Sequence, residues 1–382
     1  MQILATCIAP QEYERELRSV SQVCRAWRGL VIGTSRLWAN IYIPLSIFLP
    51  ERRQKIPYMK LYLQRAIDHP LRLTIDPGVM VMRHPLIPPR PFDERTAMGR
   101  VIRDIVVPHI SRCTAISIQA EFGFSLQEAL SALDLTADAL ETLETSRVFI
   151  KSRAPISYFS DESTLFPPRF RAPRLQKMKL CPNDALVRGT TTVSEKFYDQ
   201  VPMIEELLIG DATGSHSIQD TILDRHIGSA TIDMKFIHNR HHSVRVLRLA
   251  RCRCREDLLE SIHLPYLTDL SFDHVEPDSI LYFLQHCTAP LLNRLELAFI
   301  LLHSAWYPLC DNDLLVSRFP LLDSLTLRYV GVSRNQSLTS LESALGNLDF
   351  CHSLHIESNH GDRKSTRLNS SHSGESRMPS SA

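Results

Sequence analysis

Histidine and cysteine side chains gather in one stretch of the sequence and are the first candidates for metal chemistry. The five residues are His238, His241, His242, Cys252 and Cys254. A single residue separates the two cysteines, whereas a zinc-binding pair usually has two to four residues between its cysteines. A strand-like apolar run, residues 244–249, also separates the histidines from the cysteines. We therefore expect no metal site here, and no cofactor elsewhere in the chain.

Arginine residues in the same stretch form a local basic patch that could bind RNA or an acidic peptide. They are Arg240, Arg245, Arg248, Arg251, Arg253 and Arg255. No aromatic residues are interleaved with them for base stacking, and the whole chain carries 43 Lys and Arg against 42 Asp and Glu. This balance favours a solvated surface over a nucleic-acid site.

Motifs for enzymatic chemistry are missing from the sequence. It has no phosphate-binding G-x-x-x-x-G-K-S/T loop, no G-x-G-x-x-G, no G-x-S-x-G and no H-E-x-x-H. A hydrolase on a repeat scaffold would need a clustered nucleophile and base, and the sequence indicates no such pair. We therefore predict a protein that is not an enzyme and has no catalytic residues.

Composition and cysteine spacing predict a folded protein in a reducing compartment. The 382 residues are 44 % hydrophobic and 22 % charged, which is typical of a globular protein with a substantial core. Nine cysteines, an odd number, lack the spacing of a disulfide framework. The start of the chain lacks the features of a secretory signal, and no apolar run has the length of a membrane span. The expected location is the cytoplasm or the nucleus.

An apolar stripe near the N-terminus predicts an amphipathic helix. Spacings of three and four residues bring together Val20, Val23, Cys24, Trp27 and Leu30. Gly33 and Ser35 then end the helix, and Leu37 and Trp38 begin a second apolar contact. On periodicity alone, this segment is a helix that packs its stripe into a core.

The letters in this segment also resemble a known family. V-C-R-A-W-R at residues 23–28 and R-L-W-A-N-I at residues 36–41 resemble the C-terminal half of the F-box, in the form common in basidiomycete fungi. The resemblance implies a substrate-recognition subunit of a Skp, cullin and F-box ubiquitin ligase. It also implies that a Skp-type adaptor is bound by Val20, Val23, Cys24, Trp27, Leu30, Leu37 and Trp38. An F-box normally opens with Leu-Pro-x-Glu, whereas this chain begins inside that first helix, so docking is expected to need residues upstream of Met1.

A loose repeat fills the remainder of the chain. Its unit is Pro-x-Leu-x-x-Leu-x-Leu, with copies that begin at Pro173, Pro202, Pro265, Pro290 and Pro320 and a copy without proline at residues 244–249. The pattern predicts a leucine-rich-repeat-like solenoid of α/β class, with one short strand per unit in a curved parallel sheet. Segments 126–133, 280–287 and 338–348 are expected to form helices of the outer layer.

The residue between the last two leucines of each unit should point away from the core. Those residues, predicted to bind a protein substrate, are Lys179, Leu208, Arg248, Ser271, Glu296 and Thr326. Arg248 and Glu296 are the candidates for specificity, unless they are only solvated. The competing function is a leucine-rich interaction scaffold with a relic F-box and no role in a ligase.

The predicted organisation has four segments. They are a truncated F-box-like helical head (1–45), a connector with the first strand and a proline-rich loop (46–105), the solenoid (106–360) and a disordered tail (361–382). The tail resembles a translated sequencing adapter, because residues 362–372 and 376–382 can be back-translated into two parts of a common short-read adapter in the expected order. No native site is therefore expected in the tail.

Overall fold

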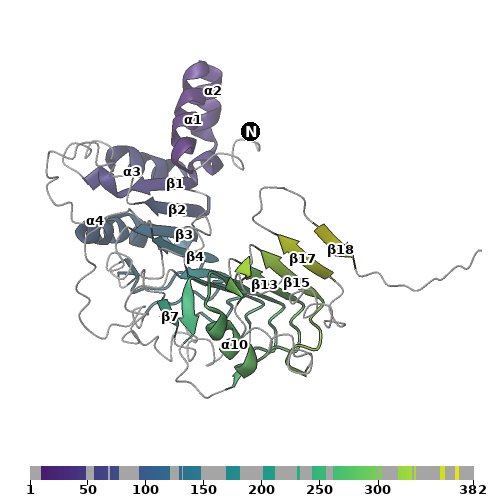
Figure 1. The fold of residues 1–382 in the computed structure, drawn as a ribbon. Coiled ribbons are helices and arrows are strands. Elements are labelled where there is room, and N and C mark those ends of the chain that lie inside the picture. The colour runs from purple at the N-terminus through teal and green to yellow at the C-terminus, as the bar shows by residue number, and fades with distance from the viewer. Residues whose placement is uncertain are drawn as a thin grey trace, which may run out of the picture. The chain divides into compact units, whose positions relative to one another are not determined.

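The computed structural model is of mixed α/β class (Figure 1). It divides into two units. The first contains Met1–Thr213 and Ala230–Ser243, and the second contains Gly214–Ser229 and Val244–Ala382. The structure describes residues 10–48, 56–67, 69–76, 94–120, 129–130, 132–147, 169–180, 201–210, 230–232, 243–254, 261–298, 301–302, 317–328, 331–332, 353–357 and 366–369. The division between the units falls near residue 244, inside the segment predicted to be one solenoid.

The first unit is built on parallel strands that follow one another in chain order. The strands are β1 (Asn40–Pro44), β2 (Leu71–Asp76), β3 (Cys113–Ala120), β4 (Thr142–Arg147), β5 (Lys177–Leu180) and β6 (Glu206–Gly210), and each pairs with the next. A short strand, β7 (Ala230–Ile232), belongs to the same unit.

Helices of the first unit precede its strands or connect them. They are α1 (Pro10–Val23), α2 (Arg25–Gly33), α3 (Ile56–Arg65) and α4 (Glu94–Val101), with the shorter η2 (Ser35–Trp38), η3 (Leu45–Phe48), η5 (Ile102–Val106) and η6 (Val107–Arg112). β1 lies inside the segment predicted to be a purely helical head. Ile41 and Ile43 alternate with more exposed neighbours and are buried, which is the period-two pattern of a strand with one face in the core.

The second unit has its own parallel strands. They are β8 (Val246–Ala250), β11 (Asp269–Asp273), β13 (Arg294–Ala298), β15 (Ser324–Arg328) and β17 (Ser353–Glu357), each paired with the next. Smaller elements are β9 (Cys252–Cys254), β10 (Ile262–His263), β12 (Cys287–Thr288), β14 (Leu301–Leu302), β16 (Gly331–Val332) and α10 (Pro277–His286). β10 pairs with β12 and β14 with β16, again in parallel.

The two leucine positions of each repeat form the core of the second unit, as predicted. Leu247, Leu270, Leu295 and Leu325 make one row in register, and Leu249, Phe272, Leu297 and Leu327 make the next. Every one of these side chains is at most 8 % exposed. Helix α10 packs Phe283 edge-on against Phe272, with 5.5 Å between the ring centroids. Stacked strands thus bury an apolar face that no single repeat could cover.

The prolines of three repeats, Pro265, Pro290 and Pro320, lie in β-turns shortly before a strand. The N–H of Leu267, Leu292 and Leu322 donates to the carbonyl of Leu264, Ala289 and Phe319, respectively. Proline is therefore the second residue of these turns, where its fixed φ suits the geometry. The fourth turn residue is a core leucine, at most 4 % exposed in all three turns.

Three other predicted segments can be compared with the structure. The helix expected at 280–287 is α10, but it begins at Pro277 and ends at His286, before Cys287 enters β12. Only residues 129–130 of the helix expected at 126–133 are described as helical, and the helix at 338–348 and the proline-rich loop lie outside the described residues. The tail was predicted to be disordered, but Thr366–Asn369 forms β18, antiparallel to β17. An edge strand offers unpaired backbone groups that an extended segment of almost any sequence can satisfy.

Candidate interaction surfaces

Helices α1 and α2 form a hairpin in the first unit, close to β1 (Figure 1). The single helix expected through Cys24 is wrong, because Cys24 has an extended backbone, with φ −159° and ψ 173°, and separates the two helices. Arg28 Nε donates to the carbonyl of Ser21 at 3.2 Å and so connects α2 to α1. Among the side chains of the pair that the structure describes, residues 16–33, the buried large apolar ones are Leu17 and Val31.

Four large apolar side chains of the hairpin are exposed. Val23 is 68 % exposed, Trp27 44 %, Leu30 51 % and Ile32 42 %. We call these four residues the exposed hairpin residues. Trp27 and Leu30 are three positions apart on α2 and therefore share a face of the helix, Cys24 is also exposed, and Val20 is partly buried. The stripe predicted to enter a core is thus mostly at the surface.

Leu37 and Trp38 lie in the interior instead, with 7 % and 5 % of their surface exposed. Trp38 Nε1 donates to the carbonyl of Val31 at 2.7 Å, and its ring stacks on Tyr62 of α3 with 5.1 Å between centroids. The guanidinium of Arg65 lies 4.5 Å from the centre of the same ring. The two residues were predicted to bind the adaptor, but in this structure they are covered by the chain itself.

Arginine side chains extend this network from the hairpin to the sheet. Arg18 of α1 lies 3.3 Å from the hydroxyl of Tyr62. Arg112, the last residue of η6 directly before β3, donates to the carbonyls of Leu63 and Ala66 at 3.0 Å each, and also to the carbonyl of Ile67. A cation beside the last carbonyls of a helix satisfies them and opposes the helix dipole. Helix α3 therefore contacts α1 through Tyr62 and the end of η6, directly before β3, through Arg112.

The predicted substrate-binding residues of the first unit are Lys179 and Leu208, and they are neighbours in register on β5 and β6. Lys179 is partly exposed. Leu208 is only 9 % exposed, so its predicted position at an accessible surface is wrong. Leu207 to Gly210 are all buried, and a strand that is buried on both faces reads as a continuous apolar run. Residues 206–210, E-L-L-I-G, do not alternate between polar and apolar, and this missing alternation was the sequence signal that Leu208 would be buried.

The predicted residues of the second unit form one row. Arg248, Ser271, Glu296 and Thr326 are register partners on adjacent strands, and His355 of β17 continues the row. Arg248 is exposed and the others are partly buried. His355 was not predicted, although it lies between Leu354 and Ile356, a weaker copy of the same repeat. We call these five residues the polar row.

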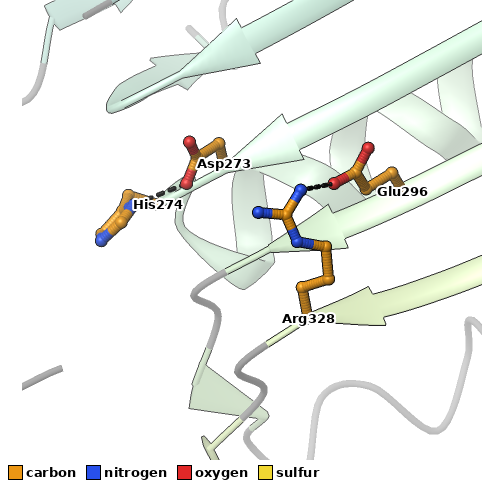
Figure 2. Close-up of polar contacts among 4 residues, drawn as sticks. All are labelled: Asp273, His274, Glu296 and Arg328. Atoms are coloured by element: carbon orange, nitrogen blue, oxygen red, sulfur yellow. Dashed lines mark hydrogen bonds and ion pairs between the residues drawn. The ribbon is translucent and has the colours of Figure 1, made fainter. Parts of the chain in front are cut away.

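Charged side chains on and beside the polar row are paired (Figure 2). Glu296 accepts from Arg328 at 2.6 Å, and His274 lies 2.6 Å from the carboxylate of Asp273. Asp269 and Arg294 are 3.8 Å apart. The pairs Glu296–Arg328 and Asp269–Arg294 are partly exposed, and such pairs contribute little to stability, about 0–1 kcal/mol each. They do fix where charge is presented, which matters for recognition more than for folding.

Groups of three or more side chains that could hold a metal ion do not occur in the part of the chain that the structure describes. Of the histidines and cysteines considered from the sequence, Cys252 is buried, whereas His238, His241, His242 and the side chain of Cys254 lie outside the described residues. Burial raises the pKa of the Cys113 thiol to about 12 and raises that of Cys287 as well. These two thiols are therefore protonated and unreactive at neutral pH.

Comparisons with known proteins give no family and no curated relative from which a function could be transferred to this chain. None of the helices among the described residues combines the length and apolar character needed to cross a membrane. No protein-family model matches the sequence, and a search of curated proteins returns no match.

Proposed function

We propose that this protein is an F-box-type substrate receptor of a Skp, cullin and F-box ubiquitin ligase, and is not itself an enzyme. The observation that carries the proposal is the exposure of Val23, Trp27, Leu30 and Ile32, within the segment whose letters resemble an F-box. Four large apolar side chains at the surface of ten consecutive residues are unfavourable in water unless a partner covers them.

The chemistry of these residues suits a protein interface. Tryptophan is enriched among the residues that dominate binding energy, especially where apolar neighbours exclude water around it. Trp38 supports the same function indirectly, because its contacts with Val31 and Tyr62 hold the end of α2 in place. A preorganised surface loses less entropy when it binds.

The remainder of the chain would act as an irregular leucine-rich solenoid that holds the protein to be ubiquitinated. Its polar row alternates in charge and size, from Arg248 to His355. A surface of this kind suits a protein with its own pattern of charges better than a uniform polyanion. The cytoplasm or the nucleus, where such ligases act, is the proposed location.

Adaptor binding is tested with a purified Skp-type adaptor and the variant Trp27→Asp/Leu30→Asp. Both side chains are exposed, so the variant should fold, yet it should lose adaptor binding by at least tenfold. Ile67→Asp is the matched control, because Ile67 is 66 % exposed and lies after α3, outside the hairpin. Titration calorimetry measures the binding of each form.

The measurement is made on the chain as given and on a form extended upstream of Met1 by a helix that opens with Leu-Pro-x-Glu. Binding by either form, lost in the double variant and kept in Ile67→Asp, supports the proposal. If neither form binds, the ligase role is refuted and an interaction scaffold without a ligase becomes the better account.

Substrate capture is tested by charge reversal in the polar row. Arg248→Glu/Glu296→Lys should reduce recovery of the native partner at least tenfold, because both changes invert the charge that the partner meets. The loss of stability should stay within about 1 kcal/mol, since only the partly exposed pair with Arg328 is broken. Quantitative mass spectrometry of partners purified with each form provides the measurement.

Arg103→Glu/Glu205→Lys is the matched control, since both residues are exposed and belong to the first unit. Equal partner recovery with the row variant and the wild type would show that the polar row is only solvated.

A further inference from the structure

Three large apolar side chains of the second unit are exposed at the same position of successive turns. Tyr266 is 52 % exposed, Leu291 42 % and Leu321 55 %. Each directly follows the proline of its turn, and so is the third turn residue. We call these three residues the turn stripe. Neither the ligase adaptor nor the polar row makes use of them.

The conformation of the turns explains why these side chains face outward. In each turn the first residue supplies the carbonyl and the fourth supplies the N–H, and both of these residues are buried. The proline and the residue after it form the tip of the turn, which points away from the core. A polar residue would serve equally well at the third position, so the turn itself does not require an apolar side chain there.

Backbone hydrogen bonds stack the turns in register. The carbonyl of Thr268 accepts from the N–H of Asn293 and Arg294, at 2.9 and 3.0 Å. The carbonyl of Asn293 accepts in the same way from Asp323 and Ser324, at 3.0 and 2.9 Å. These bonds begin two residues after each member of the stripe, so the stripe inherits the spacing of the strands, about 4.8 Å per step. Its three side chains thus form a continuous apolar ridge about 10 Å long.

The first unit provides an internal comparison. Its turns at the same point of the repeat contain Pro173 and Pro202, which are followed by Arg174 and Met203. In the first of them the N–H of Leu175 donates to the carbonyl of Ala172, as in the turns of the second unit. A charged residue is therefore accommodated by the same kind of turn. The unbroken apolar ridge belongs to the second unit and is not a general requirement of the repeat.

The spacing of the turn stripe determines whether a helix or a strand of a partner fits along it. An α-helix laid along the ridge places residues i, i+3 or i+4, and i+7 at about 0, 5 and 10.5 Å, because its rise is about 1.5 Å per residue. Alternate residues of an extended strand lie about 6.7 Å apart and reach about 13 Å over the same three side chains. The ridge, with steps of about 4.8 Å, therefore matches a helix and drifts out of step with a strand.

Charge beside the ridge gives such a helix a direction. The residues that follow the turns form a parallel row through the same hydrogen bonds, from Arg245 through Thr268 and Asn293 to Asp323. Arg245 is exposed at one end of this row, and Asp323 lies partly exposed at the other. The negative, carboxyl end of a helix dipole is favoured beside Arg245, and the positive, amino end beside Asp323.

From this geometry we infer that the turn stripe binds an amphipathic helix of another protein. The helix lies across the turns, buries apolar residues at i, i+3 or i+4, and i+7, and directs its amino end toward Asp323. This inference is independent of the proposed ligase role, because a scaffold without a ligase would use the same ridge.

The test selects binders to the full chain from two displayed libraries of equal size. One is a helical miniprotein randomised along one helix face, and the other is a β-hairpin protein randomised along one strand. The binders are then titrated against Tyr266→Asp/Leu291→Asp/Leu321→Asp, against Leu291→Asp alone, and against Met203→Asp as the matched control. All of the substituted side chains are exposed, so the variants should retain the wild-type melting temperature within a few degrees.

Helical binders should predominate and should carry apolar residues at the helix spacing. Their affinity should fall at least tenfold for the triple variant and by a smaller factor for Leu291→Asp. They should bind Met203→Asp as they bind the wild type. The variant Arg245→Glu/Asp323→Lys should also bind the helical binders more weakly than the wild type does, because its reversed charges oppose the helix dipole. A selection in which the binders sensitive to the triple variant have strand spacing, in which no binder is sensitive to it, or which yields no binders would overturn the inference. So would dimerisation of the wild-type chain that the triple variant abolishes, because a second copy would then be the occupant.

Discussion

Replacing Trp38 with Ala is expected to lower the free energy of unfolding of the first unit by about 3–5 kcal/mol. The side chain is 5 % exposed, and its removal leaves a cavity between α2 and α3. It also removes the donor to the Val31 carbonyl and the ring that the Arg65 guanidinium covers. Chemical denaturation followed by circular dichroism gives the change in unfolding free energy.

Trp27→Ala is the matched control for this experiment. The same residue type is 44 % exposed on α2, so its loss should cost less than about 1 kcal/mol. Similar large losses for both tryptophans would mean that the hairpin packs against the protein through Trp27, and would remove the surface on which adaptor binding depends.

Replacing Phe272 with Ala is expected to cost about 3–5 kcal/mol in the second unit. Phe272 is fully buried between Leu249 and Leu297 in its row, and it meets Phe283 of α10 edge-on. The adjacent Ser271 points to the opposite face of the same strand, so Ser271→Ala should change stability by no more than about 0.5 kcal/mol.

A double-mutant cycle separates the ring contact from simple burial. Phe272→Ala and Phe283→Ala combined should be less destabilising than the sum of the two, by about 0.5–1.5 kcal/mol. Strict additivity would show that α10 and β11 do not share the contact in solution.

Alternation along the strands was the part of the fold that the sequence specified best. Leu270 and Phe272 flank Ser271 as the repeat predicts, because a side-chain period of two leaves no other way to bury both apolar residues of a short strand. The same rule placed Arg248 and Glu296 on the other face. It failed at Leu208, because its strand is apolar on both faces and the repeat pattern alone does not report what covers the second face.

The hairpin was harder to predict. The spacing of Val20, Cys24 and Trp27 fits one helix, and helical periodicity does not reveal an extended residue such as Cys24 that divides it. Periodicity also does not distinguish a stripe that packs inward from one that faces solvent. Burial of Trp38 depends on Tyr62 and Arg65, more than twenty residues further along the chain, and such contacts cannot be read from a local pattern.

Among the described residues, two groups of exposed apolar side chains differ in geometry. One is on the hairpin of the first unit, around Trp27 and Leu30, and the other is the turn stripe of the second unit. The partners that we propose for them differ in form, since the hairpin would offer a helix to its partner and the turn stripe would receive one.

Hydrogen–deuterium exchange of the chain extended upstream of Met1 by a helix that opens with Leu-Pro-x-Glu, with and without a Skp-type adaptor, tests the central claim most directly. The account predicts slower exchange of backbone amides in residues 20–34 when the adaptor is present, and unchanged exchange around the turn stripe and the polar row. Exchange in residues 20–34 that the adaptor leaves unaltered, or protection located instead at Tyr266, Leu291 and Leu321, would contradict it.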